Sequence, residues 1–135
     1  MLILSKFSSL VEAHGHGSRI QNFRTTVSPQ LREGPVVLIG ALNNDWTMNR
    51  TSSLRFHFEG IAATTNFVYW IADRHHPESR AWQIIAHAQS SDVLKDYAIA
   101  ARFTDEGTGQ VVLVAVGITG SGTRAAGEFL PMRQI

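Results

Sequence analysis

Apolar residues gather in two uninterrupted runs that are typical of buried strands. The first run, PVVLIGA, covers Pro35–Ala41, and the second, VVLVAVG, covers Val111–Gly117. A strand that is apolar without alternation is buried on both faces, as in the middle of an α/β sheet. We therefore predict that Val36–Ile39 and Val111–Val116 are central strands that lie parallel in one sheet.

Four further segments have the composition of strands. TTNFVYWIADR and RAWQIIAHA, separated by the turn HHPES, predict a hairpin in which Trp70 and Trp82 face each other. DYAIAARF and the second apolar run, joined by the glycine-containing loop TDEGTG, predict another hairpin. SRIQNFRTT, within Ser18–Thr26, alternates in the manner of a weak edge strand.

Helices are predicted between and after these strands. A first helix is capped by Asp45 or Thr47. It runs to Phe56 or Phe58, and a second helix covers Thr123–Leu130. The order of elements is then β, β, α, four strands and α. This order predicts an α/β fold: a mixed, mostly central-parallel sheet with helices on its faces, Rossmann-like in its three layers, with β-hairpins.

The composition limits the classes of function. The chain has 135 residues, near the usual size of one domain, and hydrophobic residues make up 44% of them. The net charge of +1 gives no strong field, so we expect this segment to bind no nucleic acid directly. The absence of cysteine excludes disulfides, thiolate nucleophiles and cysteine-bound metals. No apolar run is long enough to cross a bilayer, so we expect a cytoplasmic protein without membrane contact.

The glycine-rich stretch after the second apolar run is the strongest candidate for a binding site. Gly120–Ala125 has the spacing G-x-G-x-x-A, but a dinucleotide site also needs an acidic residue about 20 positions later. A Walker A loop would have lysine where Thr123 stands. Free N–H groups at a helix start still favour an anion, with help from Thr123 and Arg124. Alternatively, the glycines only form a strand-to-helix turn with Thr123 as the N-cap.

A second loop, GALNNDW, also follows a predicted buried strand and precedes a predicted helix. Because parallel strands end at the same edge of a sheet, we expect the two loops to share a crevice there. The predicted ligand-binding residues are Asn43, Asn44, Asp45, Trp46, Gly120, Ser121, Gly122, Thr123 and Arg124. Asparagine and aspartate are also ordinary turn residues, so a purely structural explanation stays open for each.

Catalytic and metal sites have less support in the sequence. The six histidines include no H-E-x-x-H spacing, so we expect no metal and no other cofactor. Ser121 lies between two glycines but lacks the G-x-S-x-G spacing of a nucleophile elbow. No catalytic residue is therefore assigned, although the members of a hydrolytic triad can come from any part of a chain.

Three phrases resemble an uncharacterised family of bacterial α/β domains: GPVVLIGALNNDWT, DYAIAARF and VVLVAVGITGSGTRAAGEFL. The resemblance covers roughly Leu31–Leu130. In that family the domain usually lies C-terminal to winged-helix or other signalling modules. The resemblance implies a regulatory or sensory role, no established chemistry, and a chain that is the C-terminal piece of a longer protein.

These patterns lead to one expected function and two alternatives. We expect residues 1–135 to form a single regulatory or sensory domain that binds a polar or anionic small molecule, or a protein partner, at the strand-carboxyl edge. The first alternative is a small hydrolase that uses the same crevice. The second is a dimerisation module, in which an exposed edge strand such as Ser18–Thr26 pairs with its twin.

Overall fold

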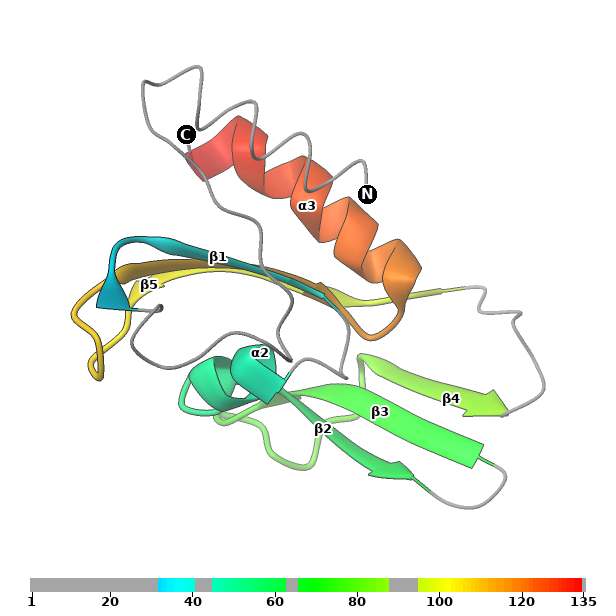
Figure 1. The fold of residues 1–135 in the computed structure, drawn as a ribbon. Coiled ribbons are helices and arrows are strands. Elements are labelled where there is room, and N and C mark those ends of the chain that lie inside the picture. Colours follow the sequence, from blue (N-terminus) through cyan, green and yellow to red (C-terminus); the bar gives the residue numbers. More distant parts are fainter. Residues whose placement is uncertain (1–31, 41–44, 63–65, 88–94, 135) are drawn as a thin grey trace.

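The computed structural model describes residues 32–40, 45–62, 66–87 and 95–134, and Figure 1 shows their arrangement. The elements in these ranges are β1 (Val36–Gly40), α2 (Asp45–Thr51), β2 (Phe56–Ala62), β3 (Asn66–Asp73), β4 (Gln83–His87), β5 (Ala98–Thr104), β6 (Val111–Gly117) and α3 (Gly120–Gln134). The predicted edge strand within Ser18–Thr26 lies outside the described residues, so it stays a prediction.

The two apolar runs of the sequence pair with each other in the first sheet, sheet A. Its strand order is β1-β6-β5. β1 pairs in parallel with β6, Val36 lying opposite Val112, so the predicted parallel pairing is confirmed. β5 pairs antiparallel with β6, as the second predicted hairpin requires. Among the described strands of sheet A only β6 is central. The predicted central, doubly buried position of Val36–Ile39 is wrong, because β1 lies at the edge of the described sheet and is half-buried except at Leu38.

The second sheet, sheet B, has the order β2-β3-β4 and is antiparallel throughout. The predicted hairpin of β3 and β4 is confirmed. The predicted pairing of Trp70 with Trp82 is wrong, because Trp82 lies just before β4 and Trp70 is opposite Gln83. The ring of Trp82 instead meets that of Phe56 edge-on, with the ring centroids 5.8 Å apart.

The predicted α/β class and the Rossmann-like three-layer sheet are wrong. The described residues are mostly β: two small sheets of three strands each, one mixed and one antiparallel, with two short helices. The main cause is the segment after α2, which ends at Thr51 instead of running to Phe56 or Phe58. Phe56–Ala62 is strand β2, and its first four residues, Phe-His-Phe-Glu, alternate between apolar and polar with the period of a strand.

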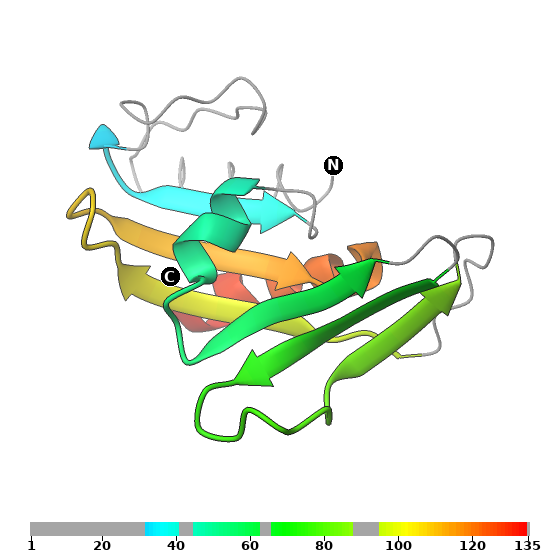
Figure 2. The same cartoon turned by 90° about the horizontal axis from the view of Figure 1, so that it is seen from below.

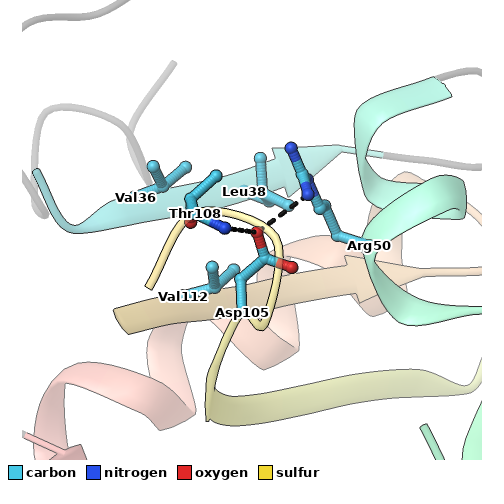
Figure 3. Close-up of a pocket in the computed structure, with 6 residues that line it drawn as sticks. All are labelled: Val36, Leu38, Arg50, Asp105, Thr108 and Val112. Atoms are coloured by element: carbon cyan, nitrogen blue, oxygen red, sulfur yellow. Dashed lines mark hydrogen bonds and ion pairs between the residues drawn. The ribbon is translucent and has the colours of Figure 1, made fainter. Parts of the chain in front are cut away.

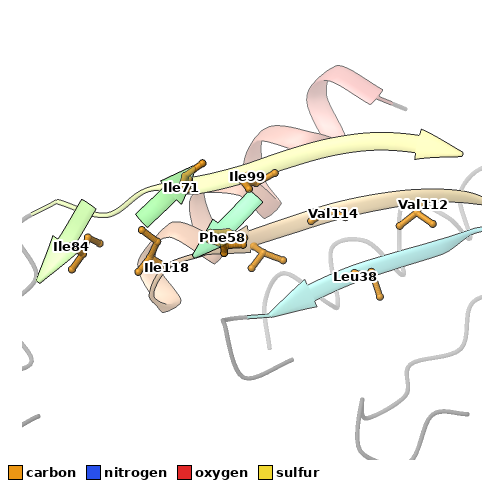
Figure 4. Packing of buried hydrophobic residues seen from close by; sticks show 9 residues of the cluster. Leu38, Phe58, Ile71, Ile84, Ile99, Val112, Val114 and Ile118 are labelled. Atoms are coloured by element: carbon orange, nitrogen blue, oxygen red, sulfur yellow. The ribbon is translucent and has the colours of Figure 1, made fainter. Parts of the chain in front are cut away.

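Apolar side chains fill the space between the two sheets (Figure 4). The buried members of this cluster are Leu38, Phe58, Ile71, Ile84, Ile99, Val112, Val114, Val116 and Ile118. On the other face of sheet A, Ala115 packs against Ala126 and Leu130 of α3. The layers are therefore α3, sheet A and sheet B, with α2 on the same side of sheet A as sheet B (Figure 1). No described helix or strand covers the outer face of sheet B, which Figure 2 shows from below.

Candidate functional site

The two parallel strands end at the same edge of sheet A, where α3 begins. The Oγ1 of Thr123 donates to the carbonyl oxygen of Gly40 at 2.5 Å. The Oγ1 of Thr123 also accepts a hydrogen bond from the N–H of Gly117, at 2.9 Å. Thr123 is only 8% exposed. Its hydroxyl therefore joins the end of β1, the end of β6 and the first turn of α3, and it faces these strands instead of solvent.

The negative charge at the start of α3 is a carboxylate of the chain itself. Asp96 accepts hydrogen bonds from the N–H of Gly122 and the hydroxyl of Thr119, both at 2.5 Å. The N–H of Thr119 also donates to Asp96, at 3.2 Å. Unpaired N–H groups and the positive end of the helix dipole favour an anion at this place. Asp96 meets that preference, and it ties the chain before β5 to the turn after β6.

Close backbone approach accounts for two glycines near this turn. A Cβ atom on Gly117 would collide with the backbone of Gly122 and Thr123. A Cβ atom on Gly122 would collide with the Asp96 carboxylate and come close to the carbonyl oxygen of Tyr97. These two positions therefore need glycine for packing within the chain, whether or not a ligand binds.

Ser121 and Arg124 are the exposed polar residues of the predicted binding turn. Arg124 Nε lies 3.2 Å from Glu128 Oε1, one helical turn further along α3. The hydroxyl of Ser121 makes no hydrogen bond with another described residue. The turn therefore presents a hydroxyl and a paired guanidinium to solvent, while the N–H groups of Thr119 and Gly122 donate to Asp96.

The second predicted loop contributes less to this edge. Trp46 is half-buried on α2 and packs against the apolar cluster between the sheets, with the Arg50 guanidinium 5.9 Å from its ring centroid. Asn43, Asn44 and the side chain of Asp45 lie outside what the structure describes. A shared crevice of the two loops therefore stays a prediction.

A shallow hollow lies at the opposite end of sheet A (Figure 3). Its lining residues are Val36, Leu38, Arg50, Asp105, Thr108 and Val112. Arg50 Nη1 lies 2.8 Å from Asp105 Oδ2, and the N–H of Thr108 donates to the same carboxylate at 3.2 Å. Burial raises the pKa of Asp105, but the hydrogen bonds of Thr108 and the charge of Arg50 outweigh it and hold the pKa below its usual value. The hollow is open to solvent, and the charges of Arg50 and Asp105 already neutralise each other. It is therefore a weak candidate for a ligand site, because ligand pockets enclose most of the ligand surface.

Sequence reasoning missed an ion pair that closes one end of sheet B. Arg55, just before β2, donates through Nε and Nη2 to both carboxylate oxygens of Asp73, at 2.8 and 3.0 Å. The N–H of His75 donates to the same carboxylate at 3.0 Å. The hydrogen bonds from Arg55 lower the pKa of Asp73 to about 2, although burial opposes the shift. The pair is recognisable only once β2 and β3 are known to be neighbours.

An exposed apolar row crosses the outer face of sheet B, and sequence reasoning missed it too. The register places Ile61 of β2 opposite Val68 of β3, and Val68 opposite Ile85 of β4, so their side chains share one face. Ile61 is 63% exposed and Ile85 is 59% exposed, the highest values for large hydrophobic residues in the described part of the chain. We call these three residues the outer row. Its one local signal is the pair Ile84 and Ile85, since neighbouring strand residues point to opposite faces.

Charged groups flank the outer row on one side. The next residues across the three strands are Glu59, Trp70 and Gln83. The guanidinium of Arg80 stacks over the Trp70 ring, 4.2 Å from its centroid. Glu59 Oε1 lies 3.0 Å from Nε2 of His57, and its side chain is about half exposed. The outer face of sheet B therefore combines the outer row with the carboxylate of Glu59 on β2 and the guanidinium of Arg80 above β3.

Within the described ranges, no group of three or more histidine, aspartate or glutamate side chains is placed to hold a metal ion. No helix in that part of the chain is long and apolar enough to span a membrane.

Comparison with known proteins gives no match: no family model, no curated protein and no solved structure matches the chain. The resemblance to the bacterial domain family therefore rests on the three quoted phrases alone.

Proposed function

We propose that this chain is a protein-binding domain with a regulatory role, and that its partner binds the outer face of sheet B. The observation that carries the proposal is the outer row, in which Ile61, Val68 and Ile85 lie in register with both isoleucines exposed. Contiguous apolar patches with a polar rim mark interaction sites, whereas single exposed apolar residues do not. The regulatory role and a cytoplasmic location belong to the same proposal, and the role rests on the family resemblance.

The glycine-rich turn supports a second candidate function, the binding of a small anion at the strand-carboxyl edge. The specific observation in its favour is that the turn already holds a carboxylate, that of Asp96. Its chemistry therefore suits an anion. An external anion would have to displace Asp96, whose hydrogen bonds to Thr119 and Gly122 also hold the chain before β5. We rank this candidate below the outer face of sheet B, and a hydrolase based on Ser121 below both.

Site-specific photo-crosslinking tests the proposed surface. A photoreactive amino acid in place of Ile85 should form covalent adducts with the partner in extracts of cells that make the protein, because this side chain points outward from the row. The control carries the same amino acid in place of Arg102, which is exposed on β5 of sheet A. Adducts at position 85 that are absent at position 102 support the proposal. Equal adducts at both positions, or none at position 85, contradict it.

A further inference from the structure

We infer that the partner of sheet B is a second copy of this chain, bound face to face about a twofold axis parallel to β3. The inference rests on the proposed contact surface and names what occupies it. Most soluble oligomers are symmetric, and a twofold interface uses the same patch on both copies. The patch must therefore be complementary to itself in shape and charge, which is a property that the outer face of sheet B can be checked for.

The outer row is complementary to itself in shape. A twofold axis that runs above Val68 and along β3 places β2 of one copy opposite β4 of the other. Each row of residues that pair across the three strands then lies opposite the same row of the other copy. Ile61 of one copy then faces Ile85 of the other, and Val68 faces its own counterpart. Every exposed apolar side chain of the row thus has an apolar partner.

The charged groups beside the outer row are also complementary to themselves under this rotation. Glu59 lies on β2, whereas Arg80 belongs to the segment that leads into β4, and its guanidinium stacks over the Trp70 ring. The same rotation therefore sets Glu59 of each copy beside Arg80 of the other. The two Arg80 groups lie nearer the axis, and each is flanked by a carboxylate of the opposite copy. Unlike charges meet twice across the interface, and such complementarity selects one partner over others.

The small size of the surface predicts a reversible dimer. The outer row has three side chains, and interfaces at the low end of the size range belong to transient complexes. We therefore expect a monomer–dimer equilibrium with a dissociation constant in the micromolar range.

Sedimentation equilibrium on the full chain, with charge-reversed variants, tests the inference. Glu59→Arg and Arg80→Glu should each raise the dissociation constant by about tenfold or more, because each sets like charges together twice. An equimolar mixture of these two variants should associate as the natural chain does, since opposite charges meet again at both contacts of the mixed dimer. Circular dichroism checks that each variant is folded.

A second pair of variants keeps the test decisive if a charge reversal disturbs folding. Ile61→Asp should abolish the dimer, whereas Phe129→Asp on α3, another exposed apolar position, should leave it unchanged. A natural chain that stays monomeric at millimolar concentration overturns the inference, as does a mixture that fails to restore association. If the chain is monomeric but position 85 crosslinks to a different protein, only the inference fails. If position 85 crosslinks to nothing, the proposed surface fails with it.

Discussion

Replacing Val114 by aspartate is expected to abolish the cooperative folding of the domain. Val114 lies in the middle of β6, is 0% exposed, and belongs to the apolar cluster between the two sheets (Figure 4). A carboxylate there would be buried without a partner, at a cost of several kcal/mol. Domains of this size have a total stability of about 5–15 kcal/mol. We expect the thermal transition, followed by near-ultraviolet circular dichroism, to disappear.

The matched control puts the same side chain on the surface. Ile85→Asp replaces an exposed residue of sheet B, so its melting temperature should stay within a few degrees of that of the natural chain. A Val114→Asp variant that melts like the Ile85→Asp variant would show that β6 is not the central buried strand.

Replacing Gly117 by alanine is expected to have the second-largest effect, a loss of about 3 kcal/mol in the free energy of unfolding. The added Cβ would enter the space occupied by the backbone of Gly122 and Thr123. Thr123 cannot move away freely, because its hydroxyl is bonded to Gly40 and to the N–H of Gly117. Denaturant titration of the variant and the natural chain measures the difference.

Gly120 offers the matched control for this substitution. A Cβ at Gly120 meets no atom within 4 Å, and its backbone does not have a positive φ. Gly120→Ala should therefore be neutral or stabilise the domain by up to about 1 kcal/mol, because alanine favours the helix that starts there. Equal effects of the two alanine variants would contradict the packing described for the turn.

Strands could be predicted from the sequence where the apolar pattern was unambiguous. The uninterrupted run of β6 and the aromatic segment of β3 are such cases, and both are confirmed. The predicted helix beyond Thr51 is wrong because two patterns overlap there. Leu54 and Phe58 fit a helical face, whereas Phe56 and Phe58 fit one face of a strand. Pairing of β2 with β3 decides between them, and no local pattern contains that information.

The candidate sites depend on contacts between distant parts of the chain. The turn from β6 into α3 could be predicted from its glycines. Its occupation by Asp96 could not, because Asp96 lies 23 residues before Thr119 and reaches it only when β5 pairs with β6. The outer row likewise exists only in the register that joins three strands. The sequence therefore shows which residues could form a site, but it does not show which of them come into contact in the fold.

We propose the outer face of sheet B, and not the glycine-rich turn, as the contact surface of this protein. The most direct measurement is a series of ¹H–¹⁵N correlation spectra of the natural chain, recorded over increasing protein concentration and then with added phosphate. We expect concentration-dependent shifts at the amides of Ile61, Val68 and Ile85, and no phosphate-dependent shifts over Gly120–Arg124. Unchanged signals from the outer row, together with phosphate-dependent shifts over Gly120–Arg124, would contradict the claim.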